Sequence, residues 1–459
     1  MLLLRRNYHS LALGAVALLL ALAVHGAGEG SLLTAGMLVI FTVIAWAFGL
    51  FVEPITSLVF FLFAVLFQVA RPETVFSGFQ SQAWWLVFGG SVIGIAVEST
   101  GLGQRLAGWL FGRAAGSYGR AVAAVALAAV GLAFVMPSTT GRILLLLPIV
   151  LAFAERIGYQ VGRRGRTGLV LTMAAASFMP PTTILPANIP NTVLLGAAET
   201  LYGVKLTYGP YLLLHFPILG ALKTACLIWM AVRLFPDADP SPAATPPDRG
   251  AMTRQEWRLA AILALMLILF ATDSFHGVSP AWVALGAAIV CLLPITELVP
   301  VKTLAAKLQV GTLIYVAGFL GLGAVVADSG LGAVLSRGLL ELAGFVPGET
   351  IRNVTLLAAI GAGLGLLTTL PGLPAVLTPL AKDMAEASGL PLLSVLMLEV
   401  VAFSTVFLPY QSPPTMIAMQ LAGVPIRSGT KLCLAVAAVT VIGLLPLDLL
   451  WWRWLGYLP

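Results

Sequence analysis

The sequence predicts an all-α polytopic membrane protein. Of its 459 residues, 59% are hydrophobic and only 10% are charged, and a soluble fold of this size cannot hide so much apolar surface. Runs of about 20 apolar residues, the length that spans a bilayer as a helix, follow one another along the chain. The formal net charge of +6 comes from basic residues in short loops between these runs, which indicates membrane topology and not a nucleic-acid partner.

Uninterrupted apolar runs are expected to form single transmembrane helices. The first follows Met1 to Arg6 and resembles a signal peptide, but it lacks a convincing small-residue cleavage site, so we expect it to remain as the first helix. The three cysteines all lie in apolar runs and predict neither a disulfide framework nor a metal site. The uninterrupted runs are 8–26, 31–51, 54–70, 83–100, 209–232, 256–273, 279–295, 311–328 and 430–456.

Four further apolar stretches are broken by prolines, glycines and hydroxyl residues that cannot continue an ordinary transmembrane helix. Irregular backbone survives at membrane depth only where it is buried in protein or lines a cavity, so the breaks predict a binding site. The broken stretches are 120–155, at Pro137 to Gly141; 167–200, at "PPTTILPANIPN"; 352–387, at "TTLPGLP"; and 391–423, at "LPYQSPP".

The distribution of basic residues predicts the topology. If the N-terminus is cytoplasmic and stretches 120–155 and 352–387 are re-entrant hairpins, most Lys and Arg residues fall on the cytoplasmic side. This arrangement has about eleven transmembrane helices plus two hairpins. We expect an N-terminal half at 1–235 whose hairpin enters from the cytoplasm, a Pro-rich cytoplasmic linker at 236–255, and a C-terminal half at 256–459 whose hairpin enters from outside.

The two halves repeat one another in sequence. Under the expected topology the second copy runs through the membrane in the opposite sense, and inverted repeats with broken helices are typical of secondary transporters. The matching segments are Gly89 to Gly103 with Gly318 to Gly332, Ser138 to Pro148 with Thr369 to Pro379, and Ala187 to Asn191 with Gln411 to Thr415.

These segments resemble the divalent anion:sodium symporters, a family within the ion-transporter superfamily. That family carries Ser-Asn-Thr at each hairpin tip, where this chain has Ser138-Thr139-Thr140 and Thr369-Leu370-Pro371. The family's Gly-Thr-Pro-Pro-Asn in the unwound helices corresponds here to 187–191 and 411–415. The resemblance implies a scaffold domain, a transport domain that moves as an elevator, a homodimer, and sodium-coupled transport of C4-dicarboxylates, citrate-like acids, sulfate or related oxyanions.

Both tips depart from the family motif. The first Asn is replaced by Thr139 and the second by Leu370, and in the family these asparagines help to bind substrate carboxylates while their neighbours coordinate sodium. Arg142, a permanent charge one helical turn after Ser138, is a further departure. Together these residues argue for weaker sodium dependence, proton coupling or exchange.

Arg142 has three interpretations. A charge at this depth is expensive unless it is paired or faces a cavity, and a guanidinium offers a planar fork of donors that suits carboxylate, sulfate or sulfonate. Arg142 therefore either contacts the anion, next to the N-terminus of the half-helix that starts near Gly141, or replaces the charge of a lost sodium ion. The structural alternative is an ion pair with Glu155 or Glu399.

Candidate site residues follow from the breaks. Glu399 is a candidate proton carrier, because burial disfavours the charged form of a carboxyl, although it could equally pair with Arg142 or lie near the outer interface. Lys223 and His215 are interpreted as snorkelling or packing residues. Sodium, if bound, is expected at Ser138, Thr139 and Asn191. The candidate substrate-binding residues are Ser138, Thr139, Thr140, Gly141, Arg142, Asn188, Asn191, Thr368, Thr369, Ser412, Pro413 and Thr415.

The leading functional hypothesis is a secondary active transporter of a small anion, with Na+ or H+ as coupling ion and no other cofactor. It would lie in the lipid bilayer of a bacterial inner membrane. A cation/proton antiporter or an arsenite-type permease of the same superfamily is the alternative, but it requires paired intramembrane carboxylates, and Glu399 is the one clear candidate. An enzyme is not expected, because no Ser-His pair, Asp-Asp pair or metal motif is present.

Overall fold

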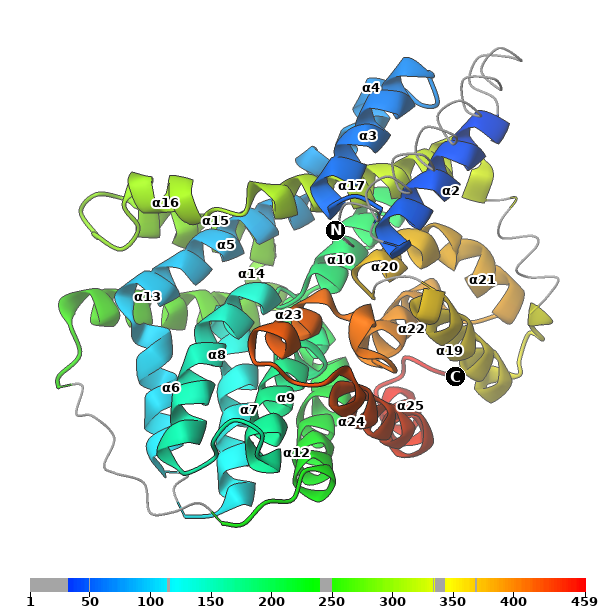
Figure 1. Ribbon diagram of the computed structural model, residues 1–459. Helices are drawn as coiled ribbons and strands as arrows, with labels where there is room; N and C mark the ends of the chain where they lie inside the picture. Colours follow the sequence, from blue (N-terminus) through cyan, green and yellow to red (C-terminus); the bar gives the residue numbers. More distant parts are fainter. Residues whose placement is uncertain are drawn as a thin grey trace, which may run out of the picture.

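The chain folds into helices throughout the described residues, and no strand occurs among them, so the prediction of an all-α fold is confirmed (Figure 1). The apolar run 8–26 lies outside the described residues. The computed structural model describes residues 32–48, 50–113, 116–239, 250–332, 334, 343–367 and 370–459.

Within this part of the chain, 5 helices are long and apolar enough to cross a membrane. They are α5 (Gln82–Thr100), α7 (Tyr118–Val135), the continuous helix α11–η3–α12 (Tyr208–Leu234), α17 (Val310–Asp328) and the continuous helix α24–η7–α25 (Ile426–Trp454). Shorter apolar helices accompany them: α2 (Leu32–Phe48), α3 (Glu53–Leu66), α15 (Pro280–Leu292), α19 (Thr350–Leu367) and α22 (Leu392–Ser404). These helices are those of an integral membrane protein.

The broken stretches form pairs of half-helices. In the first, α7 ends at Val135 and α8 (Thr139–Arg156) begins after Ser138, whose side chain accepts a hydrogen bond from the Gly141 N–H at 3.1 Å and so caps the new helix. The second pair is α9 (Arg164–Phe178) and α10 (Ile189–Tyr202), and the third is α22 and α23 (Pro413–Leu421). Prolines at the starts of α10 and α23 lack an N–H, which suits the first turn of a helix.

The remaining elements connect and flank these helices. They are α4 (Pro72–Val75), η1 (Ser77–Gln80), α6 (Leu102–Arg113), η2 (Pro180–Thr183), α13 (Arg254–Ala271), α14 (Asp273–His276), α16 (Val301–Lys307), η4 (Leu370–Gly372), α20 (Leu373–Leu377), η5 (Thr378–Leu380), α21 (Ala381–Ser388) and η6 (Pro409–Gln411).

The same order of elements occurs in both halves. A long helix (α5 or α17) is followed by a hairpin, then a broken helix, then a long helix interrupted by a π-helical segment, which is η3 (Phe216–Leu222) in the first half and η7 (Thr440–Leu444) in the second. The halves interlock, because α23 packs on α8 and α9 while α10 packs on α20 and α22. Residues distant in sequence therefore meet around the breaks.

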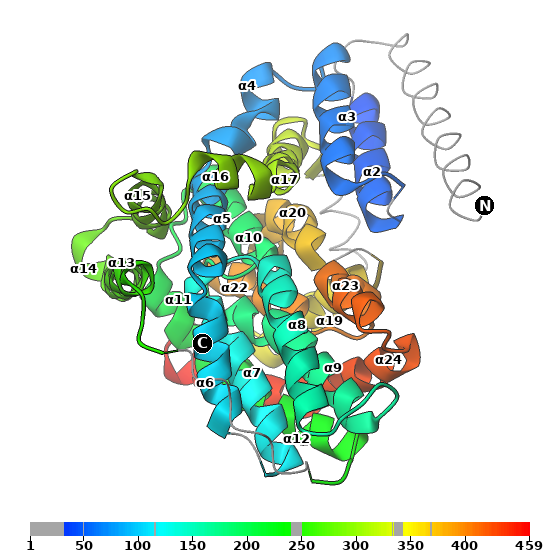
Figure 2. The same ribbon diagram turned by 60° about the vertical axis from the view of Figure 1, so that its left-hand side comes forward.

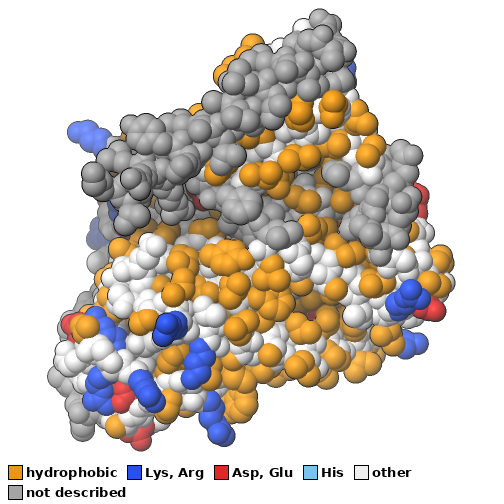
Figure 3. Space-filling view, turned by 45° about the vertical axis from the view of Figure 1, so that its right-hand side comes forward, with side chains coloured by type: hydrophobic (Ala, Val, Ile, Leu, Met, Phe, Trp, Pro, Cys, Tyr) orange, Lys and Arg blue, Asp and Glu red, His pale blue; other side chains and the backbone are white. Residues whose placement is uncertain are grey.

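Two hydrophobic clusters divide the interior. The smaller one joins α2, α3 and α17, which lie together at the top of Figures 1 and 2 and away from α9 and α12 at the bottom. Trp46 of α2 stacks on Phe319 of α17 with ring centroids 4.0 Å apart. The larger cluster fills the space among the broken helices. Figure 3 shows hydrophobic side chains spread over the outer face, with Lys and Arg most numerous at its lower left and others at its right edge and upper left.

The start of the linker is held against α9. Asp237 accepts a hydrogen bond from the Gly165 N–H at 2.8 Å and pairs with Arg163, and the Tyr159 hydroxyl donates to the Ala238 carbonyl at 2.8 Å. The hydrogen bond from the Arg163 guanidinium lowers the pKa of the Asp237 carboxyl below its ordinary value. Residues 240–249 lie outside the described part of the chain.

We predict that Gly361→Ala destabilises the fold. A Cβ on Gly361 of α19 would lie 2.5 Å from the Cβ of Ala402 in α22, so the two helices would have to move apart, and such overpacking costs about 1–3 kcal/mol. Gly363→Ala, on the same helix, is the matched control because nothing lies within 4 Å of the added atom. The midpoint temperature of thermal unfolding should fall for Gly361→Ala only. Equal midpoints for the two variants would contradict close packing of α19 on α22.

Candidate functional site

A cavity of about 390 Å³ lies where the breaks meet α3, α5 and α17. One wall is made by the tip of the first hairpin, the unwound segment before α10 and the start of α23, with Pro371 after the second hairpin's break. The opposite wall comes from α3, α5 and α17 and includes Ser91, Thr312 and Tyr315. The cavity thus lies between the broken helices and α3, α5 and α17, and concave sites between packed elements are where small ligands bind.

Three helices begin at this cavity. The N-terminal residues of α8 (Thr139 and Thr140), α10 (Ile189 and Pro190) and α23 (Pro413) all line it. The N-terminus of a helix carries a partial positive charge, which favours bound anions. Pro413 and Pro414 lack N–H groups, so α23 supplies mainly its dipole, whereas the first turns of α8 and α10 keep N–H groups besides the one that Pro190 removes.

Arg142 lies behind the cavity and not in its wall. Its side chain is fully buried, and its two terminal nitrogens donate to oxygens that are all electrically neutral, while its Nε–H has no partner within the described residues. The acceptors are the carbonyls of Met136, Ala187 (3.0 Å) and Ser177 (2.7 Å) and the side-chain oxygens of Thr139 (3.1 Å) and Asn188 (3.0 Å).

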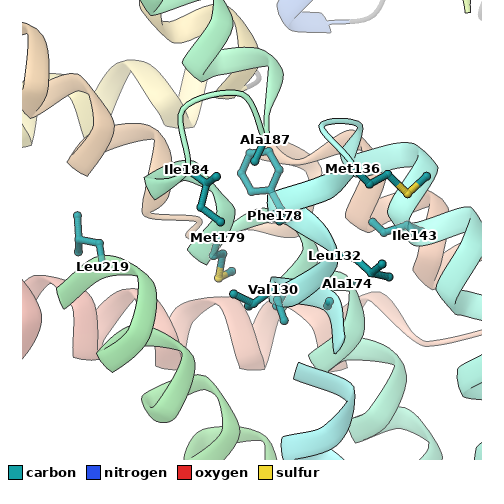
Figure 4. Packing of buried hydrophobic residues seen from close by; sticks show 14 of the residues in the cluster. Val130, Leu132, Met136, Ile143, Ala174, Phe178, Met179, Ile184, Ala187 and Leu219 are labelled. Carbon is teal, nitrogen blue, oxygen red and sulfur yellow. The ribbon is translucent and has the colours of Figure 1, made fainter. Parts of the chain in front are cut away.

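The carbonyls in this set are available because helices end there. Met136 follows α7 and Ser177 stands in the last turn of α9, where backbone carbonyls have no partner within the helix. Figure 4 shows Met136, Phe178 and Ala187 among the apolar side chains that pack around these segments. The guanidinium therefore sits in a dry environment, in which each hydrogen bond is electrostatically strong.

The structure rejects two of the three interpretations of Arg142. Glu155 pairs with Arg166 at 2.8 Å, and Glu399 accepts a hydrogen bond from the Thr378 hydroxyl at 2.9 Å. The predicted ion pair with either carboxylate is therefore wrong. Direct contact with an anion is also unsupported, because Arg142 does not line the cavity and its terminal nitrogens are engaged by protein oxygens. The third interpretation, replacement of a sodium charge, agrees with the geometry.

Asn188 connects the hairpin tip to the unwound segment. Its amide oxygen accepts from the Thr139 hydroxyl at 2.5 Å and from Arg142, and its amide nitrogen donates to the Phe178 carbonyl at 2.9 Å. Asn191 lies deeper and donates to the Ile184 carbonyl at 2.7 Å, which stabilises the turn of the same segment. Asn188 lines the cavity, whereas Asn191 does not.

A neutral side chain makes the corresponding joint in the second half. The Gln411 amide donates to the Gly365 carbonyl of α19 at 2.5 Å, and its oxygen accepts from the N–H groups of Phe407 (2.7 Å) and Leu408 (2.8 Å). Leu370 is buried, as is usual for an apolar side chain. Thr368 and Thr369 lie outside the described residues.

Comparison with known proteins agrees with this architecture. The sequence model of the sodium:sulfate symporter transmembrane region matches residues 8–458. The chain belongs to the sodium:sulfate symporter family. The family resemblance inferred from the motifs is thereby confirmed. Because this family consists of transporters, the chain is a membrane transporter for a small anionic substrate and not an enzyme.

The chain is similar to two proteins at low sequence identity. A protein of Cupriavidus necator named "Membrane protein" is 25% identical over 404 residues, covering 83% of this chain and 76% of the relative. The "Sodium-dependent dicarboxylate transporter SdcS" of Staphylococcus saprophyticus is 22% identical over 406 residues, covering 81% and 77%. The Alcanivorax borkumensis YdaH transporter has a similar fold, with a TM-score of 0.54 and 16% identity over 83% of this chain and 87% of that one.

The predicted site residues form two layers, one in the cavity wall and one behind it. The residues in the cavity wall are Ser138, Thr139, Thr140, Asn188 and Pro413. The residues behind it are Gly141, Arg142, Asn191, Ser412 and Thr415, of which Ser412 and Thr415 share a hydrogen bond of 2.9 Å between their hydroxyls. Sequence reasoning missed the opposite wall, including Tyr315 and Glu53, because single polar residues at the edges of apolar runs carry no local signal.

We predict that Thr139→Val lowers the stability of the protein, whereas Thr140→Val weakens anion binding and leaves stability nearly unchanged. Thr139 joins Asn188 and Arg142, so its loss should lower the free energy of unfolding by about 1–3 kcal/mol. The Thr140 hydroxyl lines the cavity and makes no hydrogen bond with a described residue, so its loss should change stability by less than about 0.5 kcal/mol and weaken anion binding about tenfold.

Thermal unfolding with and without sulfate or succinate measures both effects. A stability loss in Thr140→Val equal to that in Thr139→Val would show that the two hydroxyls do not lie in separate layers.

Proposed function

We propose that this protein is a secondary active transporter that carries a small divalent anion, such as a dicarboxylate, sulfate or a related oxyanion, across a bacterial inner membrane. In this proposal Arg142 takes the place of one coupling sodium ion, the N-terminus is cytoplasmic, and the chain works as a homodimer. Support for the substrate class comes from the three helix N-termini at the cavity and from the similarity to a relative named as a dicarboxylate transporter.

The observation that carries the proposal is the set of five oxygens around the Arg142 guanidinium, here called the oxygen cage. It consists of the carbonyls of Met136, Ser177 and Ala187 and the side-chain oxygens of Thr139 and Asn188. Carbonyl and hydroxyl oxygens are the ligands that hard cations take in proteins, and Arg142 fills such a set with its own charge, with no carboxylate in it. A sodium ion at Thr139 would have to compete with the guanidinium for the same hydroxyl. A fixed charge costs no binding step, so we infer that this half of the site needs no sodium.

An elevator motion is supported by how the site is divided. Arg142, Asn188 and Gln411 bind the hairpins to the unwound segments through hydrogen bonds, so these parts can move as one body. The facing wall of α3, α5 and α17 contributes separate residues to the cavity. We propose that the broken helices form the transport domain and slide against this wall, with the hairpins entering from opposite sides of the membrane.

Glu399 remains a candidate for proton coupling. Its buried carboxyl connects α22 to Thr378 in the second hairpin region, and its second oxygen has no hydrogen-bond partner within the described residues. The Thr378 carbonyl in turn accepts from the Tyr202 hydroxyl at 2.7 Å. Protonation of Glu399 could therefore change how α22 and the hairpin are joined.

We predict that Arg142→Gln creates sodium dependence. The wild-type protein should be stabilised equally by succinate or sulfate in sodium and in choline buffer, by about 2.7 kcal/mol at a hundred times the dissociation constant. In Arg142→Gln the oxygen cage loses its charge, so stabilisation should fall in choline and recover at least in part in sodium.

Arg166→Gln is the control for this experiment, because Arg166 forms a peripheral pair with Glu155 far from the cage. Equal anion stabilisation of Arg142→Gln and wild type in choline would refute the role of Arg142 as a sodium substitute.

We predict that Gly90→Ala slows transport and preserves anion binding. A Cβ on Gly90 of α5 would lie 2.6 Å from the Cγ of Pro137 at the hairpin tip, so it would disfavour this position of the transport domain. Gly131→Ala in α7 is the control, since nothing lies within 4 Å of the added atom. Uptake into proteoliposomes should drop several-fold for Gly90→Ala only; unchanged uptake would argue against sliding at this contact.

A further inference from the structure

A second buried cation, Lys223 of the N-terminal half, contacts the break between α22 and α23 in the C-terminal half. Lys223, in the first turn of α12, is 1% exposed, so of the two interpretations, snorkelling or packing, snorkelling is excluded. Its ammonium donates to the Ser404 carbonyl at 2.6 Å and contacts the Ser404 hydroxyl at 3.3 Å. Ser404 is the last residue of α22, immediately before the backbone unwinds.

This contact has a counterpart at Arg142. Arg142 donates to the Ser177 carbonyl in the last turn of α9, and Lys223 donates to the Ser404 carbonyl at the end of α22. Both carbonyls belong to the C-terminal, partially negative end of a half-helix that stops inside the protein, and a cation is stabilising there. The two sites differ chemically, because a guanidinium is permanently charged whereas an amine in a buried site can release its proton.

The surroundings of Lys223 favour proton exchange. Asp448 belongs to α25, which packs against η3, the segment that ends directly before Lys223. The two side chains do not form an ion pair, and Lys223 donates to Ser404 instead. Asp448 is fully buried, and neither of its oxygens makes a hydrogen bond of ordinary geometry with a described residue; the Trp452 indole is the side-chain donor that approaches it. A buried carboxylate left so poorly satisfied is costly.

His215 completes this group of buried polar side chains. Its ring packs on Trp452 with centroids 5.5 Å apart, and neither ring nitrogen has a hydrogen-bond partner in the described part of the chain. Lys223, Asp448 and His215 flank the two π-helical segments, which pack against each other across the halves. π-Helical segments are frequent at functional sites. The contact between η3 and η7 has an ionisable group nearby from each half, Lys223 from the first and Asp448 from the second.

We propose that Lys223 and Asp448 form a proton-binding site that couples proton movement to anion transport, with the protonated Lys223 acting as the releasable cation of the second half. The proposal rests on the proposed anion-transport function and adds the identity of the coupling ion. It places coupling at the end of α22, the half-helix that also carries Glu399.

The proton step balances without any other reactant. On loading, a proton from water adds to the lone pair of the Lys223 nitrogen, and the ammonium binds the Ser404 carbonyl. On release, the N–H bond breaks, the electron pair stays on nitrogen, and the proton passes to water. Asp448 makes no ion pair with Lys223, so in this proposal it acts as a buried carboxylate on a neighbouring segment and not as the direct proton acceptor. Loss of the charge removes the cation from the end of α22 and weakens its attachment to α12.

The test uses full-length protein in proteoliposomes, with choline in place of sodium as the only added cation. Uptake of labelled succinate and sulfate is measured with and without an inward proton gradient, together with anion-for-anion exchange and the thermal shift that each anion causes. Lys223→Arg keeps a charge that cannot titrate, and Asp448→Asn keeps the shape of the side chain. Glu399→Gln tests the competing proton site, and Lys302→Arg, an exposed residue of α16, is the control.

The wild type, Lys302→Arg and Glu399→Gln should be stimulated at least fivefold by the gradient. Lys223→Arg and Asp448→Asn should lose this stimulation and keep exchange and the anion-induced thermal shift, which also establish that they are folded. Full stimulation in both variants, loss only in Glu399→Gln, or exchange without any gradient response in the wild type would each overturn the proton site. A wild type that neither binds nor exchanges either anion would overturn the transport function as well.

Discussion

A permanent charge inside a membrane must be surrounded by protein oxygens, and the first half of this chain is arranged around that requirement. The guanidinium of Arg142 takes its acceptors from the end of α7, the start of α8, the last turn of α9 and the unwound segment before α10. Those acceptors exist because four helix ends meet there, and each end leaves backbone carbonyls or N–H groups without partners. The charge and the broken helices therefore satisfy each other, and neither would be tolerated alone.

The same helix breaks give the cavity a positive electrostatic potential. Where α8, α10 and α23 begin, their positive dipole ends face the cavity, while the C-terminal ends of α9 and α22 face Arg142 and Lys223. The interrupted helices thus attract an anion with their N-terminal ends and bind cations with their C-terminal ends. The two halves share this plan but differ in charge, since Gln411 makes the second joint with a neutral amide and leaves the cation to Lys223 on another helix. That difference is the physical basis for expecting one permanent and one releasable charge.

Sequence reasoning located the breaks and the hairpin hydroxyls because prolines and polar residues interrupt apolar runs in a way that one-dimensional patterns reveal. It singled out Arg142 for the same reason and offered charge replacement as one of its interpretations, which remains a proposal. It left Lys223 open between snorkelling and packing and overlooked Asp448, because a single charge in an apolar run looks the same whether it reaches the interface or another helix. Lys223 follows η3 directly and Asp448 lies four residues after η7, so their proximity depends on how these two segments pack against each other.

By itself the sequence determined the class of the protein, the positions of the broken helices and the family to which the chain belongs, because hydrophobic length, helix-breaking residues and motif spacing are local properties. Only the tertiary structure decided which oxygens surround Arg142, that neither Glu155 nor Glu399 is its partner, and that Lys223 ends at α22. These outcomes depend on which helix ends converge, as when α23 packs on α8 and α9. A buried charge is satisfied by acceptors from distant segments, and the identity of those segments is set by packing.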